Sequence, residues 1–119
     1  MKTFTKVSLL VLSFMSTPAF ADAIPIEIYD PIDAEIVKAD RKGRGEFEAE
    51  FRLRGDDVRP LAESVIDHAY DEGFRLEESE IDREDADLKF RRGDQRLDVQ
   101  IELKDRYRIE YKADLDLDR

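Results

Sequence analysis

The sequence predicts an α+β domain in which one amphipathic helix packs on a mainly antiparallel sheet of about five strands, in the order β-α-β-β-β-β. Apolar and charged residues alternate in several segments after Glu46, which is the period of a half-buried strand. Between Val58 and Tyr70 the apolar residues recur instead at spacings of three and four, which place them on one side of a helix. Glycines and acidic turn residues separate these segments, so we expect one helix followed by consecutive hairpins.

The N-terminal segment has the organisation of a secretory signal peptide. Two lysines precede a short apolar run from Val7 to Met15, and a small-x-small pattern ends at Ala21. We expect cleavage after Ala21 and export, most simply to a bacterial periplasm, with no membrane anchor left on the mature chain. Residues 22–119 then carry a net charge of −12 instead of −10, because the removed segment contains two lysines and no acid.

The mature chain divides into an N-terminal arm and linker, residues 22–45, and a single domain, residues 46–119. Pro25 and Pro31 interrupt the arm, where alternating isoleucines allow at most a short edge strand. We interpret the arm as packed on the domain. The glycine-rich and cationic stretch 40–45 is expected to be a flexible, solvated connector.

Composition excludes several classes of function. The acidic excess argues against binding to nucleic acid or to anionic membranes. The chain has no cysteine, so it has neither disulfides nor the cysteine that anchors a lipoprotein. After residue 21 it has one histidine, His68, two serines and no threonine, which leaves little material for a hydrolytic triad. We therefore predict no catalytic residues and no cofactor.

The first predicted strand, Glu46 to Arg54, and the helix after it are the clearest elements. Asp56 or Asp57 is expected to cap the helix N-terminus, and Gly73 to end it. His68 falls on the flank of the apolar stripe, where an ordinary boundary histidine is favoured over a catalytic or metal-binding one.

The charges of the last three strands are the main candidates for a site, and cross-strand pairing tests them. If they only solvate one face, opposite signs should lie opposite one another, because like charges destabilise a ladder. A two-residue turn at Gly93 and Asp94 gives the pairs Phe90–Leu97, Leu88–Val99, Lys89–Asp98 and Arg91–Arg96. Pairing Leu103 with Tyr107 in the last hairpin gives Ile101–Ile109, Val99–Tyr111, Glu102–Arg108, Asp98–Lys112 and Arg96–Asp114. Opposite signs meet in most pairs, so we interpret these charges as a solvated face and not as a site.

The opposite, apolar face of the sheet raises a question of coverage. A helix of about 17 residues is roughly 25 Å long and shields only part of a five-stranded sheet. The rest of the face must meet the arm, a second subunit or a partner. The leading hypothesis is therefore a non-enzymatic binding module for a protein or an envelope component, which uses its uncovered sheet face or its arm, or which forms a homodimer there.

An acidic turn between two predicted strands is a weak candidate metal site. It contains Asp82, Glu84, Asp85 and Asp87, and carboxylate oxygens are the ligands that calcium prefers. The plain alternative is a tight polar turn. The rival function of a different class is accordingly a small metal-dependent or carboxylate-dependent enzyme.

The segments "VRPLAESVIDHAYDEGFRL", "ADLKFRRGDQRLDVQIEL" and "YRIEYKADLDL" resemble a family of small exported bacterial proteins of unknown function, mostly lipoproteins. Shared features are a helix that ends in glycine and an aromatic residue, an inward alanine, and a terminal Y-x-I-x-Y strand. These features lie at Gly73, Phe74, Ala86, Tyr107, Ile109, Tyr111 and Leu115. The chain departs from that family because it lacks the lipidation cysteine and has phenylalanine where tryptophan is usual. The resemblance implies an exported α+β domain and no catalytic residues.

The order and size of the elements also resemble PepSY-type periplasmic domains, although the usual terminal D-x-x-T-G turn is absent. This second resemblance implies a modulator of proteases.

Overall fold

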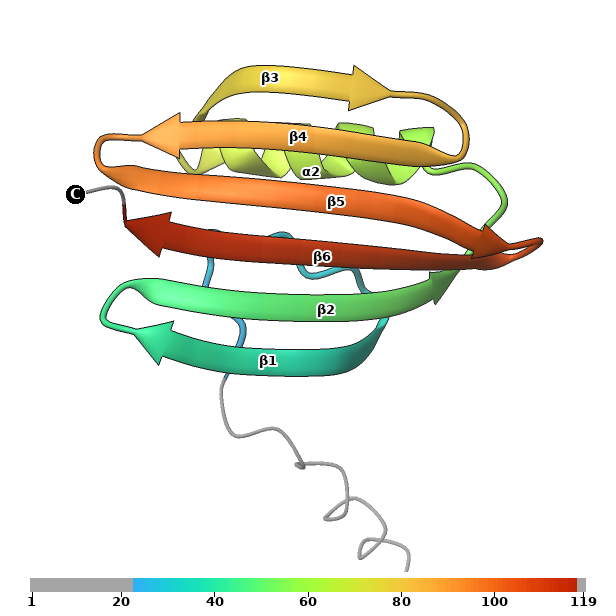
Figure 1. Ribbon diagram of the computed structural model, residues 1–119, viewed down its shortest axis with the longest axis horizontal. Coiled ribbons are helices and arrows are strands. Elements are labelled where there is room, and N and C mark those ends of the chain that lie inside the picture. Colours follow the sequence, from blue (N-terminus) through green and yellow to red (C-terminus); the bar gives the residue numbers. More distant parts are fainter. Residues whose placement is uncertain (1–22, 118–119) are drawn as a thin grey trace, which may run out of the picture.

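The structure is a computed structural model that describes residues 23–117. It contains one helix and one six-stranded antiparallel sheet with the strand order β1-β2-β6-β5-β4-β3 (Figure 1). The elements are β1 (Glu35–Gly43), β2 (Glu46–Arg54), α2 (Arg59–Asp71), β3 (Arg75–Ile81), β4 (Asp85–Arg92), β5 (Gln95–Asp105) and β6 (Arg108–Leu117). The predicted α+β class is therefore confirmed. The predicted signal peptide, residues 1–21, lies outside the described residues.

The prediction of five strands in the order β-α-β-β-β-β is wrong, because the structure has six strands in the order β-β-α-β-β-β-β. The additional strand, β1, lies within the stretch that was expected to be arm and linker. Its pairing with β2 shifts register between Ile36 and Lys38 and again between Arg41 and Gly43. These irregularities remove the period-two pattern from the sequence. The stretch expected to be a flexible connector is the end of β1 and its turn, in which Gly45 has a φ of 78°.

The central geometric prediction, apolar side chains on one face and charges on the other, is confirmed. Val99, Ile101 and Tyr111 are at most 1% exposed. They belong to a core to which five strands, the helix, the arm and the residues flanking the helix contribute. Its other members are Ile28, Ala39, Phe47, Ala49, Phe51, Val58, Ala62, Val65, Ala69, Phe74, Ala86, Leu88, Phe90, Leu97, Ile109, Ala113 and Leu115. Burial of these side chains is the dominant favourable contribution to folding.

The N-terminal arm, residues 23–34, covers the part of the apolar face that the helix leaves open. Helix α2 contacts β3 and β4, and the arm runs behind β2 and β6 on the same side of the sheet (Figure 1). Ile28 of the arm is 2% exposed. The Tyr111 hydroxyl donates a hydrogen bond to the carbonyl oxygen of Tyr29 at 2.9 Å, and His68 Nε2 lies 2.7 Å from the carbonyl oxygen of Ile26. The arm is thus an integral part of the inner layer.

The helix is bounded almost as expected. Val58 is the N-cap and makes no side-chain cap bond, so the predicted cap at Asp56 or Asp57 is wrong by at least one residue. Asp57 Oδ1 nevertheless accepts the N–H of Arg59 at 3.0 Å, because an aspartate just before a helix can reach one of its free amides. Gly73 ends the helix with a φ of 90°. No helix within residues 23–117 is long and apolar enough to cross a membrane.

Of the two predicted registers, one is confirmed and one is wrong. Strands β4 and β5 pair as expected, with Leu88 opposite Val99 and Lys89 opposite Asp98. Strands β5 and β6 are shifted by two residues, so that Leu103 faces Ile109 instead of Tyr107. The cause is an irregularity between Leu103 and Asp105. It tightens the turn and leaves Tyr107 at the turn with 58% of its surface exposed. A shift of two residues keeps each side chain on its face but changes its partner across the ladder.

Candidate functional site: an acidic row on the outer face

The outer face of the sheet, opposite the helix and the arm, carries four acidic residues in one line. Asp40 on β1 lies opposite Glu48 on β2, Glu48 opposite Asp114 on β6, and Asp114 opposite Asp98 on β5. We call these four residues the acidic row. Because the side chains of residues directly opposite one another lie about 5 Å apart at Cβ, the row is a continuous line of carboxylates.

The acidic row contradicts the opposite-sign pairing predicted for the last hairpin. Asp98 was expected to face Lys112, but it faces Asp114, and Lys112 faces Gln100 instead. Like charges directly opposite one another destabilise a ladder by a few tenths of a kcal/mol up to about 1 kcal/mol. The opposite-sign pair predicted for Asp98 across the last hairpin is therefore wrong, whereas its predicted pair with Lys89 across the β4–β5 ladder is confirmed. The row becomes the best candidate for a functional surface.

Two lysines of β1 pair with Glu48, and Lys89 of β4 lies opposite Asp98 at the far end of the acidic row. Lys38 Nζ and Lys42 Nζ lie 2.8 Å and 3.1 Å from Glu48 Oε1. Their hydrogen bonds, that of Lys38 foremost, hold the pKa of Glu48 below its ordinary value. Glu48 is therefore a stably ionised carboxylate that already has partners.

The neighbouring carboxylates of Asp98 and Asp114 are electrostatically unfavourable to each other. Burial raises the pKa of Asp114 above its ordinary value, and the carboxylates of Glu48, Asp116 and Asp98 raise it further. Asp98 Oδ1 is shielded from solvent and has no hydrogen-bond partner among residues 23–117. Both carboxylates would gain from a cation, because a positive charge offsets the mutual repulsion and a donor satisfies the free oxygen.

A shallow hollow of about 160 Å³ lies over this part of the sheet. Its lining contains Glu48, Asp87, Lys89, Asp98, Lys112 and Asp114, so acids outnumber bases. At about 30 Å³ per molecule, the hollow has room for about five waters. An ammonium or guanidinium group fits this space together with part of its hydration.

A second acidic line runs parallel to the first. Asp85 on β4 lies opposite Glu102 on β5, and Glu102 opposite Glu110 on β6. Lys104 Nζ approaches Glu102 Oε1 at 3.4 Å. The outer face is thus acidic over a broad area and not only along one row.

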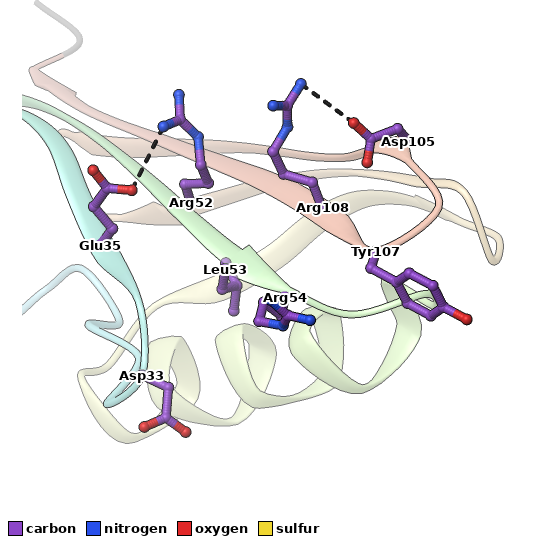
Figure 2. Close-up of a pocket in the computed structure, with 8 residues that line it drawn as sticks. All are labelled: Asp33, Glu35, Arg52, Leu53, Arg54, Asp105, Tyr107 and Arg108. Atoms are coloured by element: carbon purple, nitrogen blue, oxygen red, sulfur yellow. Dashed lines mark hydrogen bonds and ion pairs between the residues drawn. The ribbon is translucent and has the colours of Figure 1, made fainter.

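The end of the sheet near the β5–β6 turn differs, because opposite charges are paired there. Figure 2 shows Arg52 next to Glu35 and Arg108 next to Asp105, with N–O distances of 3.5 Å and 3.6 Å. This end borders a cleft of about 440 Å³ in which acids and arginines are balanced. The balanced end has no excess of negative charge, which makes it a matched control for the acidic row.

The weak metal candidates of the sequence lie at the β3–β4 turn and do not converge on one point. Asp82 Oδ1 accepts the N–H groups of Glu84 at 2.8 Å and Asp85 at 3.0 Å, and these bonds lower the pKa of Asp82. The carboxylate of Glu84 approaches Arg83 at 3.3 Å, whereas Asp87 lies on β4 and faces Gln100. Within residues 23–117, no group of three or more histidine, cysteine, aspartate or glutamate side chains is arranged to hold a metal ion.

His68, the single histidine, holds the arm. Its Nε2 atom bonds to the Ile26 carbonyl, and its ring lies 5.6 Å from that of Tyr29. This contact fits the boundary role that its position on the helix indicated.

No known protein family matches the sequence, and comparisons with characterised proteins and with solved structures find no match.

Proposed function

We propose that this protein is an exported, non-enzymatic binding protein that recognises a basic protein through the acidic row. The observation that carries the proposal is the register of four carboxylates, Asp40, Glu48, Asp114 and Asp98, directly opposite one another on neighbouring strands. At the balanced end of this sheet opposite charges are paired, which cross-strand energetics favour, whereas the row places like charges opposite one another. A basic partner turns an unfavourable line of like charges into a favourable interface.

The sign of the charge selects among the possible partners. The mature chain, residues 22–119, with a net charge of −12, repels nucleic acid and anionic lipid surfaces and attracts basic proteins over a distance of about a Debye length. The hollow between Asp98 and Asp114 provides a place for one lysine or arginine side chain of such a partner. Binding at a flat charged face is expected to be fast and sensitive to salt.

Affinity capture from bacterial envelope extracts tests this function. The bait is the mature chain, residues 22–119, immobilised through its C-terminus. We expect a basic protein to be retained at low ionic strength and released by about 500 mM salt, where screening is strong. The double variant Asp98→Asn, Asp114→Asn, used as the bait, should no longer capture this protein.

A second bait controls for total charge. The double variant Glu35→Gln, Asp105→Asn also removes two negative charges, but from the balanced end. It should retain the partner. Equal capture by both double variants, or a captured protein that is acidic, would show that the acidic row is not the recognition surface.

A further inference from the structure

A second cleft lies on the inner side of the sheet, and the proposed function does not use it. It has a volume of about 730 Å³ and is bounded by the arm, the end of β2 and the first turns of α2. This volume falls in the range of ordinary ligand-binding clefts. Its apolar lining is contributed by Pro31, Ile32, Leu53, Pro60, Leu61 and Ile109. We call it the arm cleft. It adjoins the balanced end, and Asp33 and Arg54, which line both clefts, are visible in Figure 2.

Ile32 is the feature of the arm cleft that most needs an explanation. Its side chain is 95% exposed, although isoleucine gains from burial. Ile28, four residues earlier on the same arm, is 2% exposed. The arm therefore places one isoleucine in the core and presents another at the rim of an apolar cleft.

The floor of the arm cleft is shaped by a close contact. A Cβ atom at Gly55 would lie 2.8 Å from the Cδ1 atom of Ile109, closer than side chains approach one another. Glycine at this position lets the chain turn from β2 toward α2 directly over Ile109, and the Gly55 N–H donates to the Tyr107 carbonyl at 3.0 Å. This hydrogen bond holds the turn in its place over Ile109.

The charged residues at the rim of the arm cleft indicate the sign of the charge that an occupant should carry. Asp33 and Asp56 line the cleft, and neither carboxylate forms an ion pair with another residue of 23–117, although Arg83 Nη1 donates to the Asp56 backbone carbonyl at 2.7 Å. Asp57, also in the lining, is already held by Arg59 at 2.8 Å. Arg54 is the single basic side chain among the lining residues. An apolar floor with two unpaired carboxylates at its edge is complementary to apolar side chains that are flanked by a positive charge.

We propose that the arm cleft binds a short apolar segment of another protein in which lysine or arginine flanks the apolar side chains. Ile32, Leu61 and Ile109 receive the apolar side chains, and Asp33 and Asp56 receive the flanking cation. A second copy of this chain is a poorer occupant, because both copies would bring the same negative charge to the contact. The site is independent of the acidic row, which lies on the other side of the sheet.

A peptide titration followed by NMR tests this inference. The probe is a synthetic peptide with two adjacent leucines flanked by a lysine on each side, added to the ¹⁵N-labelled mature chain. We expect saturable shifts of the amide signals of Ile32, Gly55, Leu61 and Ile109. A peptide with glutamates in place of the lysines, and one with serines in place of the leucines, should each bind at least about tenfold more weakly.

Three variants locate the site without disturbing the core. Ile32→Ser should weaken binding by about tenfold or more, because Ile32 loses its apolar contact. Ile26→Ser is the matched control, since Ile26 is also exposed, at 68%, but does not line the cleft; it should bind as the unchanged chain does. The double variant Asp33→Asn, Asp56→Asn should bind more weakly and lose most of its salt dependence.

Several results would overturn the inference. They are absence of saturable shifts, equal binding of the glutamate peptide, and equal effects of the Ile32 and Ile26 substitutions. Shifts confined to Asp98 and Asp114 would mean that the lysines bind the acidic row; the arm cleft would then be excluded while the proposed function stands. If the Ile32 signal shifted with protein concentration in the absence of peptide, the occupant would be a second copy of this chain. That result would also overturn the proposed binding of another protein's segment.

Discussion

The hydroxyl group of Tyr111, at the centre of β6, donates a hydrogen bond of 2.9 Å to the backbone carbonyl of Tyr29 in the arm. The two residues are 82 positions apart in the chain. Tyr111 is fully buried, and its burial raises the pKa of the hydroxyl, so the group stays protonated and remains a donor at any physiological pH. This bond fixes an arm that has no helix or strand of its own to the inner face of the sheet.

Replacement of Tyr111 by phenylalanine should destabilise the fold by about 1–2 kcal/mol, because the Tyr29 carbonyl then loses its partner. Urea unfolding measures the loss. Hydrogen exchange at the Ile28 amide, which donates to the Pro25 carbonyl at 3.0 Å within the arm, should become faster. Tyr107→Phe, at an exposed turn position, should change neither quantity. Equal effects of the two substitutions would mean that the bond does not hold the arm.

Replacement of Ile28 by alanine should lower the free energy of unfolding by about 2–4 kcal/mol, because it leaves a cavity between the arm and the sheet. The measurement is again the free energy of unfolding in urea. Ile26→Ala is the control, and its effect should stay within about 0.5 kcal/mol, since Ile26 is largely exposed. If Ile28→Ala proved as mild as Ile26→Ala, the arm would not be a structural part of the core.

The sequence predicts well which face of the sheet a side chain occupies, but it predicts poorly which residues lie opposite one another on neighbouring strands. The reason is physical. Alternation fixes which side of a strand a residue occupies, so Val99 and Tyr111 were correctly placed inside. The turn at Gly93, with a φ of 62°, also fixed the register of β4 and β5. The β5–β6 register was mispredicted because an irregularity after Leu103 shortens the turn, and nothing in the local alternation reveals it.

The candidate site depended on that register. A shift of two residues leaves Asp98 on the outer face but replaces Lys112 with Asp114 as its neighbour. The first member of the row, Asp40, was missed for a related reason, since the irregular pairing of β1 hides the strand in the sequence. One signal was present: alternation places Asp98 and Asp114 on the same outer face, where a shift of two residues makes them neighbours.

Replacement of Asp114 by asparagine should stabilise the folded chain at pH 7. Because the pKa of Asp114 is raised in the folded state, the ionised carboxylate is less favourable there than in the unfolded chain. Removal of one like charge from the row is expected to raise the free energy of unfolding by about 0.2–1 kcal/mol. As the pH falls through the raised pKa toward the unfolded value near 3.8, the folded wild-type chain takes up the proton and the advantage of the variant disappears.

Urea unfolding of both chains between pH 7 and pH 3 checks this prediction. Asp105→Asn, which removes a carboxylate 3.6 Å from Arg108 at the balanced end, should bring no gain at pH 7. A stabilising Asp114→Asn variant that binds its partner more weakly is the expected signature of a functional surface, because such surfaces retain unfavourable charges for binding. Loss of stability at pH 7 would contradict the electrostatic account of the row.

The Asp57 carboxylate should titrate with a midpoint of about 2, well below its ordinary value of 3.8. The cause is Arg59, whose Nη2 and Nε atoms lie 2.8 Å and 2.9 Å from the Asp57 oxygens and whose backbone N–H adds a third bond. Because the folded pKa is lowered, the stabilising effect of the ionised group is complete above about pH 4 and is lost as the pH falls toward 2. Side-chain carboxyl ¹³C shifts measure the midpoint directly. In Arg59→Ala the midpoint should move up but stay below 3.8, since the backbone N–H remains; an unchanged midpoint would rule out the guanidinium as the main cause.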